Sequence, residues 1–306
     1  MVCDSGRTRD TGILLPLLTP LVGYLIAAVL ANLFFEPSTR TSSSFATAML
    51  RMGGSYLNLN ATTSSAKKGE SLSDTIKVMS EYADVLVVRH PDVDVFGALD
   101  DIRYPGIPIL NAGNGSDEHP TQALLDLLCI QSELGHIDGL TITLAGDLKH
   151  GRTVHSLSYV LSRFDNIKLY LVSPPELRLP TEWLGRLLVN NPTMQIIESN
   201  SYQKVLGKTD VLYMTRIQQE RFDSAEAYEA VKGSFELTAA DLKGSRALVM
   251  HPLPRVNEIR SDVDVMPNAR YFEQVGYGVV MRMALLGLAL GAKPSQNAKG
   301  LVSFGQ

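Results

Sequence analysis

The sequence predicts an α/β protein with two doubly wound parallel-sheet domains and a functional site in the cleft between them. Short apolar segments of strand length alternate with segments of helix length along both halves of the 306-residue chain. This alternation is typical of parallel sheets covered by helices. Most of the apolar segments are continuous, as expected for strands that are buried on both faces. Hydrophobic residues make up 45% of the chain, which is sufficient for two cores of ordinary size.

The first half of the chain supplies the first predicted sheet. Residues 27–35 form a continuous apolar run, which predicts a buried strand. Pro37 then forces a turn, and residues 41–51 are predicted as the helix that follows it. The other elements expected in this half are strands at 55–59, 84–88 and 107–110, a helix at 70–82, a Gly-rich turn at 111–115 and a long helix from Pro120 to near Gly135.

The second half repeats the same alternation. Strands are predicted at 140–145, 168–172, 211–214 and 247–250, and helices at 153–164 and 271–290. The last helix is strongly apolar, and we expect it to pack back across the first domain. The predicted domains are therefore residues 1–135, completed by residues 271–306, and residues 136–270.

Composition excludes several classes of protein. The net charge of −4 leaves no basic surplus, so nucleic acid is not expected as a partner. Any anion that the protein binds must be held by local groups of charges. The two cysteines are too few for a disulfide framework or a cysteine zinc site, which favours a reducing compartment and a cytoplasmic location.

The N-terminal apolar segment allows two interpretations. Residues 13–35 are long enough to span a bilayer, and Arg7 and Arg9 precede them. However, Pro16, Pro20 and Gly23 interrupt the run. Its last residues lead directly into a polar loop that needs a strand to position it. We therefore assign residues 27–35 to the sheet, with a membrane anchor at 13–28 as the weaker alternative.

The turn after this strand has the composition of an anion site. Ser38, Thr39, Arg40 and Thr41 stand at the predicted start of a helix. Backbone N–H groups at a helix start lack intrahelical partners and carry the positive end of the helix dipole. Hydroxyls and a guanidinium in the same turn complete a binding site for a phosphate. An ordinary N-cap is the alternative, but it explains only one hydroxyl.

Polar groups also follow the other predicted strands. In open α/β sheets ligands bind beyond the carboxyl ends of the strands. Arg40, Arg89, Arg152 and Arg216 all lie at or just beyond such ends. A single surface arginine is usually a solvated charge, but four in equivalent positions predict substrates with several negative charges, such as a phosphate and carboxylates.

One histidine stands apart from the others. His119 opens a predicted helix beside Gln122. The helix dipole disfavours a charged imidazole there, which suits a donor to a carbonyl oxygen better than a base. The remaining histidines lack acidic or cysteine neighbours at metal-ligand spacing, so no metal is expected. The stretch at 146–151 lacks the G-x-G-x-x-G pattern, so a nicotinamide site is not expected either.

Seven segments together resemble the transcarbamoylases, and within them the aspartate carbamoyltransferases. They occur in family order and cover residues 33–290. The segments are Ser38-Thr39-Arg40-Thr41, Lys67-Lys68-Gly69-Glu70, Val88-Arg89-His90-Pro91, His119-Pro120-Thr121-Gln122, the ten residues 146–155, Met214-Thr215-Arg216-Ile217-Gln218 and His251-Pro252-Leu253-Pro254-Arg255.

The resemblance implies roles for residues at both substrates. Carbamoyl phosphate is bound by the phosphate loop Ser38, Thr39, Arg40 and Thr41, by Arg89, His119 and Gln122, and by the backbone of Leu253 and Pro254, which a cis peptide usually joins. L-aspartate is bound by Lys68, Arg152 and Arg216, with Gln218 beside them. Arg40, Thr41, Arg89 and His119 are the implied catalytic residues.

The resemblance also implies an assembly and a reaction. Members of the family form homotrimers with shared active sites, to which the neighbouring subunit contributes the residues matching Ser64 and Lys68. The amine of aspartate attacks carbamoyl phosphate directly in de novo pyrimidine biosynthesis, so the enzyme needs no nucleophile of its own. No cofactor and no metal are required.

Two departures from the common pattern carry information. Ser42 and Ala46 stand where many bacterial members have Arg and Glu. This form is similar to the domain within the animal and fungal multifunctional pyrimidine-synthesis protein, so further pyrimidine-pathway domains or subunits are possible partners. Residues before 27 match the family poorly.

Two alternatives remain open from the sequence. An ornithine carbamoyltransferase usually has cysteine at the position of Pro252, and Arg152 and Arg216 suit a dicarboxylate better. A non-catalytic homologue is disfavoured because the matched site residues are all present. An assay with aspartate and with ornithine as the second substrate distinguishes an aspartate carbamoyltransferase from an ornithine carbamoyltransferase.

Overall fold

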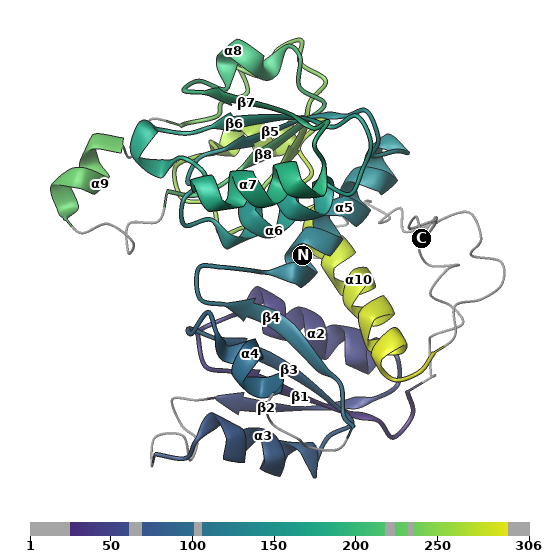
Figure 1. The fold of residues 1–306 in the computed structure, drawn as a ribbon. Helices are drawn as coiled ribbons and strands as arrows, with labels where there is room; N and C mark the ends of the chain where they lie inside the picture. The colour runs from purple at the N-terminus through teal and green to yellow at the C-terminus, as the bar shows by residue number, and fades with distance from the viewer. Residues whose placement is uncertain (1–24, 61–68, 101–105, 218–223, 232–234, 293–306) are drawn as a thin grey trace, which may run out of the picture. The chain divides into compact units, whose positions relative to one another are not determined.

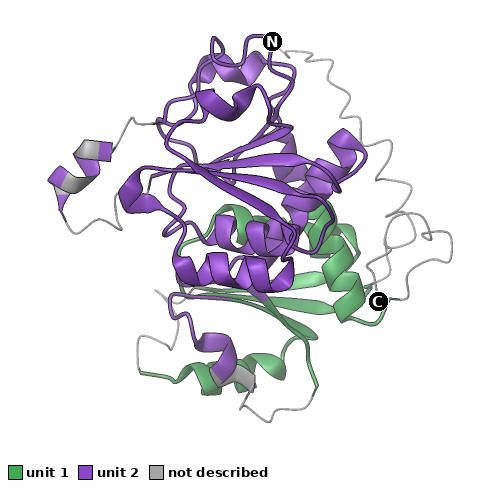
Figure 2. Ribbon diagram, turned by 45° about the horizontal axis from the view of Figure 1, so that its top comes forward, with its two compact units in different colours: residues 1–88, 103–110, 279–306 green, residues 89–102, 111–278 purple. Residues whose placement is uncertain are grey.

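A computed structural model describes residues 25–60, 69–100, 106–217, 224–231 and 235–292. Contacts between residues divide the chain into two compact units (Figure 2). Unit 1 comprises residues 1–88, 103–110 and 279–306, and unit 2 comprises residues 89–102 and 111–278. Each unit therefore contains segments that are far apart in the sequence.

Four strands form the first sheet, in the order β2-β1-β3-β4 (Figure 1). β1 (Val29–Phe34) pairs in parallel with β2 (Ser55–Asn60), and helix α2 (Arg40–Arg51) connects them and packs on both. β3 (Val85–His90) and β4 (Ile109–Asn114) begin in unit 1 and end in unit 2. α3 (Leu72–Ser80) leads into β3, and α4 (Val95–Asp100) follows it.

The C-terminal helix α10 (Glu273–Ala289) contributes to unit 1 from residue 279 onward. The buried Arg282 on this helix donates from Nη1 to Ser44 Oγ at 3.1 Å. Its guanidinium carbon also lies 5.0 Å from the centre of the Phe45 ring, a cation–π distance. The part of α10 from residue 279 onward therefore packs on α2 within unit 1.

Unit 2 contains a five-stranded sheet in the order β7-β6-β5-β8-β9, in which neighbouring strands pair in parallel. Its strands are β5 (Thr141–Ala145), β6 (Lys168–Val172), β7 (Gln195–Ser199), β8 (Val211–Met214) and β9 (Leu248–Met250). Its helices are α5 (Pro120–Leu134), α6 (Arg152–Leu161), α7 (Thr181–Asn190), α8 (Gln203–Leu206) and α9 (Ala225–Val231), with 3₁₀ turns at Pro175–Leu177 and Ser261–Val265.

The two faces of this sheet bury two separate cores. Ile142 and Leu144 of β5 join the core formed with α5, α6 and α7 (Figure 1), whereas Ala145 joins the core on the opposite face, with α8 and the segment after β9. Adjacent strand residues point to opposite faces, so nearly every position of a central strand is apolar. This explains the continuous apolar runs and confirms the two-domain parallel α/β prediction.

Two local predictions need correction. The turn predicted at 111–115 is instead strand as far as Asn114, because β4 lies beside β3 at the edge of the sheet. The edge strand β7 and helix α7 were not predicted.

No helix within the described ranges is long and apolar enough to cross a membrane. The possible anchor at 13–28 lies outside them except for its last four residues.

Candidate active site

The predicted anion site lies at the start of α2 in unit 1. Thr39 is the N-cap and Arg40 the first helical residue, both exposed, whereas Thr41 is buried. The first turn of the helix contains no acidic residue to offset the positive end of the dipole. Ser42 Oγ donates to the Ser38 carbonyl at 2.6 Å and so fixes the turn itself. The geometry suits an anion beside Ser38 to Thr41.

A buried asparagine in β1 ties this turn to the sheet. Asn32 is 1% exposed and donates from Nδ2 to Ser42 O at 3.3 Å and to Asn58 Oδ1 at 3.0 Å. A polar side chain in the centre of an apolar strand is costly unless it is hydrogen-bonded. The sequence analysis did not assign Asn32 a role, although its position inside an apolar run was a usable signal.

In unit 2 the ends of β5 and β8 approach each other closely. Ala145 is aligned with Met214 in the parallel register. A Cβ atom on the next residue, Gly146, would lie 2.3 Å from the carbonyl oxygen of Thr215, and Gly146 has φ +118°. Only glycine is compatible with this approach. The segments that carry Arg152 and Arg216 therefore leave the sheet side by side.

Arg152 reaches from the first turn of α6 to the end of β4. Its Nη1 donates to Gly115 O at 2.6 Å, and its guanidinium passes the Cα of Gly113. Gly115 N in turn donates to the carbonyl of His90, the last residue of β3, at 2.9 Å. The structure therefore brings Arg152 together with the segment that carries Arg89.

The loop before Arg152 is shaped by Asp147, whose side chain is fully buried. Its Oδ1 accepts from Lys149 N at 3.1 Å and from His150 N at 2.9 Å, and its Oδ2 lies 3.2 Å from His150 Nδ1. Asp147 thus folds the loop that delivers Arg152. Asp147 was not among the predicted site residues, although its position between a strand and a helix was a usable signal.

His119 occupies the N-cap position of α5, with Pro120 as the first helical residue, as predicted. It is buried, and its backbone N donates to Ser156 Oγ at 2.9 Å. Three positions along α5, Gln122 donates from Nε2 to Asp126 Oδ1 at 2.8 Å. Hydrogen bonds therefore fix His119 and Gln122, the two residues predicted to bind substrate, at the start of the same helix.

His155 stabilises the same region from α6. Its imidazole nitrogens lie 3.3 Å from Asp117 O and 3.0 Å from Leu148 O, and its ring stacks on Trp183 at 4.7 Å. Burial lowers the pKa of His155 below its ordinary value of 6.5, more than the two carbonyl contacts raise it. His155 is therefore a neutral structural residue between two loops of the site.

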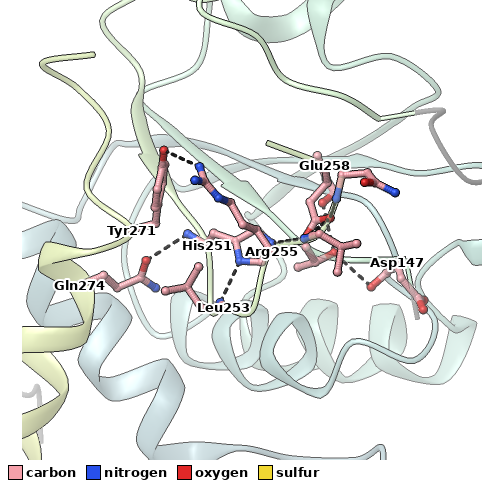
Figure 3. Close-up of polar contacts among 11 residues, drawn as sticks. Asp147, His251, Leu253, Arg255, Glu258, Tyr271 and Gln274 are labelled. Carbon is pink, nitrogen blue, oxygen red and sulfur yellow. Dashed lines mark hydrogen bonds and ion pairs between the residues drawn. The ribbon is translucent and has the colours of Figure 1, made fainter. Parts of the chain in front are cut away.

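The segment after β9 contains the predicted cis peptide between Leu253 and Pro254, which the structure confirms. Leu253 has φ +55°, an uncommon conformation for a non-glycine residue. Figure 3 shows His251 beside it: Leu253 N donates to His251 Nδ1 at 2.8 Å, and His251 Nε2 lies 2.7 Å from Glu258 Oε1. The loop is thus fixed from within by a buried histidine.

Glu258 anchors this loop from the other side. Its Oε2 accepts from Val256 N at 3.1 Å and Asn257 N at 3.0 Å. Burial by itself would raise the pKa of Glu258, but the hydrogen bond from His251, with backbone donors, holds it below the ordinary 4.5. The carboxylate form is the one that the loop requires.

The predicted site residues fall into three groups. Arg89, His119, Gln122, Arg152, Arg216, Leu253 and Pro254 belong to unit 2, and Ser38, Thr39, Arg40 and Thr41 belong to unit 1. Ser64, Lys68 and Gln218 lie outside the described residues.

Two parallel α/β units with basic and hydroxyl groups at their strand ends define a class of α/β proteins suited to binding anionic ligands. The family model of the aspartate/ornithine carbamoyltransferase carbamoyl-P binding domain matches residues 20–132, and that of the Asp/Orn binding domain matches residues 138–289. The chain belongs to the aspartate/ornithine carbamoyltransferase family.

Individual relatives point to the aspartate branch. The chain is 50% identical over 259 residues to an aspartate carbamoyltransferase catalytic subunit of Methanocaldococcus jannaschii, covering 84% of this chain and 83% of the relative. It is 48% identical over 273 residues to the multifunctional protein pyr-3 of Neurospora crassa, covering 86% of this chain but 14% of that protein.

Solved structures agree with these relatives. The catalytic subunit of M. jannaschii aspartate transcarbamoylase has a TM-score of 0.84 at 45% identity, covering 94% of this chain and 93% of that one. The Trypanosoma cruzi enzyme in complex with N-(phosphonacetyl)-L-aspartic acid has a TM-score of 0.82 at 46% identity, covering 87% and 84%.

Proposed function

We propose that this protein transfers the carbamoyl group of carbamoyl phosphate to the amine of L-aspartate, giving N-carbamoyl-L-aspartate and phosphate. The observation that carries the proposal is the placement of Arg152, which links the strand ends of β3, β4 and β5 on the side where parallel sheets bind ligands. T. cruzi aspartate transcarbamoylase has been solved with carbamoyl phosphate and aspartate, at 46% identity to this chain.

The two substrates are assigned to two domains. Residues 1–135, completed by 271–306, bind carbamoyl phosphate, and residues 136–270 bind aspartate. The division between the two matched family models, at residues 132 and 138, supports this assignment.

Carbamoyl phosphate is held at both of its ends. The phosphate binds at the start of α2 to Ser38, Thr39, Arg40 and Thr41, where the helix dipole and a guanidinium favour an anion. Arg89, His119 and Gln122, with the Leu253–Pro254 backbone, bind the remainder of the molecule. Arg40 neutralises charge on the departing phosphate.

The reaction requires no covalent intermediate with the enzyme. The amine lone pair of aspartate attacks the carbonyl carbon, forming the C–N bond, and the C–O bond to phosphate breaks with its electron pair leaving on phosphate. The proton lost by the amine passes to phosphate or solvent. His119, Arg89 and Thr41 donate to the carbonyl oxygen as its negative charge develops. Most of the rate enhancement comes from holding two polyanions in reacting geometry.

Aspartate binding involves a second subunit. Arg152 and Arg216, with Gln218, bind the two carboxylates of aspartate, and Ser64 and Lys68 of the adjacent subunit complete the site in a homotrimer. If so, two inactive variants, Lys68→Ala and Arg216→Ala, regain activity when their subunits are mixed, because some sites then contain neither substitution. Mass photometry of the same mixture gives the subunit number.

The cellular role follows from the product. N-carbamoyl-L-aspartate is an intermediate of pyrimidine biosynthesis, and we place the protein in the cytoplasm. The match to part of N. crassa pyr-3 supports additional pyrimidine-pathway domains or subunits as partners.

The decisive experiment is an assay of purified protein with carbamoyl phosphate and either aspartate or ornithine. Formation of carbamoyl aspartate, with no citrulline, is the expected result. Citrulline formation would establish the ornithine alternative. Tight binding of N-(phosphonacetyl)-L-aspartate without turnover would instead indicate a non-catalytic homologue.

A further inference from the structure

Asp126 is a fully buried acid in the middle of α5 with three donors directed at it. Gln122 Nε2 donates to Oδ1 at 2.8 Å, and Gln274 Nε2 donates to the same oxygen at 2.6 Å. The hydroxyl of Tyr213 donates to Oδ2 at 2.8 Å. Burial and the neighbouring Asp126 raise the pKa of Tyr213 well above 10, so this hydroxyl keeps its proton. These three donors come from α5, β8 and α10.

The amide of Gln274 has only one orientation that fits its neighbours. Its Oε1 accepts from the backbone N of His251 at 3.0 Å, and a backbone N–H can only donate. Its Nε2 must therefore face Asp126. Gln274, which is 1% exposed, consequently connects Asp126 to the segment after β9 (Figure 3 shows its contact with His251).

The tautomer of His251 is fixed in the same way. Its Nδ1 accepts from Leu253 N, so the proton of the neutral imidazole lies on Nε2 and is donated to Glu258. One continuous hydrogen-bonded chain therefore runs from Gln122 through Asp126, Gln274 and His251 to the backbone of Leu253.

The ends of this chain are two predicted contacts for the same substrate. Gln122 is held with its Nε2 toward Asp126, which leaves Oε1 as an acceptor for a ligand donor. Leu253 contributes its backbone in the left-handed conformation that His251 supports. A buried carboxylate is rarely the most stabilising choice for a core position, and the three donors that surround Asp126 suit a role in fixing geometry.

We propose that Asp126 and Gln274 are positioning residues that hold Gln122 and Leu253 together as the receptor for the carbamoyl end of carbamoyl phosphate. This inference rests on the proposed function. Neither residue touches the substrate; each acts through the groups that it orients. The phosphate end, assigned to the start of α2, does not depend on them.

This separation defines the test. We would titrate the full-length protein with inorganic phosphate and with phosphonoacetamide, a phosphonate that carries the amide end. Gln274→Met and Asp126→Leu should weaken phosphonoacetamide binding by about tenfold or more, since each leaves buried donors or acceptors without partners. Phosphate binding should stay within roughly twofold, because the phosphate is assigned to the start of α2 in unit 1, whereas Asp126 and Gln274 belong to unit 2.

Two further variants separate positioning from general damage. Asp126→Asn should keep both affinities within about threefold, because the amide oxygen accepts from both glutamines and Tyr213 turns to accept from the amide nitrogen. Thr143→Val is the matched control. It removes an equally buried hydroxyl, bonded to Thr209 at 2.7 Å, in the same unit but outside the chain of contacts. It should leave both affinities unchanged.

The outcomes are distinct. Loss of phosphonoacetamide binding alone, with rescue by Asp126→Asn, supports the proposal. The proposal is overturned if Gln274→Met binds phosphonoacetamide with wild-type affinity, or if it loses affinity for phosphonoacetamide and phosphate alike. Both outcomes can be read from Gln274→Met even if Asp126→Leu fails to fold. If the wild-type protein binds neither ligand and forms no carbamoyl aspartate, the proposed function itself is wrong.

Discussion

Arg282 and Ser44 are 238 positions apart in the sequence, yet the guanidinium of the first donates to the hydroxyl of the second at 3.1 Å. The same guanidinium lies over the ring of Phe45. Because Ser44 and Phe45 belong to α2, this contact of α10 supports the helix that carries the predicted phosphate loop.

Replacing Arg282 by methionine tests that support. The variant should lose about 1–3 kcal/mol of unfolding free energy, since Ser44 loses a buried donor and Phe45 loses its cation. Arg282→Lys keeps the charge but loses the planar stacking on Phe45. Its unfolding free energy should therefore lie between those of the wild type and the methionine variant. Urea denaturation monitored by fluorescence measures both; a methionine variant as stable as wild type would contradict this interpretation.

Arg40→Ala tests the phosphate loop itself. Arg40 is exposed, so the fold should survive, whereas kcat should fall by about 10²–10³-fold with loss of charge stabilisation on the leaving phosphate. Arg51→Ala, at the exposed far end of the same helix, is the matched control and should be active. Steady-state kinetics measure kcat, and the melting temperature of each variant shows whether the fold is intact. A near-normal kcat in Arg40→Ala would refute the role of Arg40 at the leaving phosphate.

Gly113→Ala probes the position of Arg152. Gly113 has φ +118°, and an added Cβ would lie 3.4 Å from the Arg152 guanidinium, so the KM for aspartate should rise by about tenfold. Gly135→Ala is the control: it also has positive φ (+81°), but no described heavy atom outside its immediate chain neighbours lies within 4 Å of the new methyl group. Both variants should be destabilised, but only Gly113→Ala should change KM.

His155 should make stability depend on pH below neutrality. Its pKa is lowered in the folded state, so the unfolded chain binds more protons, and stability falls as pH drops below about 6.5. His155→Gln should flatten this part of the stability curve. Denaturation between pH 5 and 8 (the ordinary range for a histidine transition) measures the slopes, and equal slopes for wild type and His155→Gln would count against a neutral buried imidazole.

Local sequence was sufficient for much of the fold. The turn before α2 was predictable because Pro37 and the hydroxyls act within a few residues, and the central strands β5 and β8 because burial on both faces leaves continuous apolar runs. β7 escaped prediction because it lies at the sheet edge, where most of its residues are exposed and polar ones are tolerated.

The residues that hydrogen-bond to the predicted site residues were harder to predict than the predicted site residues themselves. Asp126 has the appearance of an ordinary helical acid, because its partner Gln274 is 148 positions away and Tyr213 is 87 away. Nothing in a local pattern reveals such pairs. Residues that meet a substrate occur at strand ends, whereas residues that hold them are determined by tertiary packing.

The distribution of unit 1 over three separate segments also sets an order of events during synthesis. Residues 279–289 are synthesised after the other two segments of unit 1, so Ser44 can bond to Arg282 only once that third segment has left the ribosome. Unit 2, complete at residue 278, can fold earlier, so the N-terminal sheet of unit 1 matures after unit 2 although its strands are synthesised first.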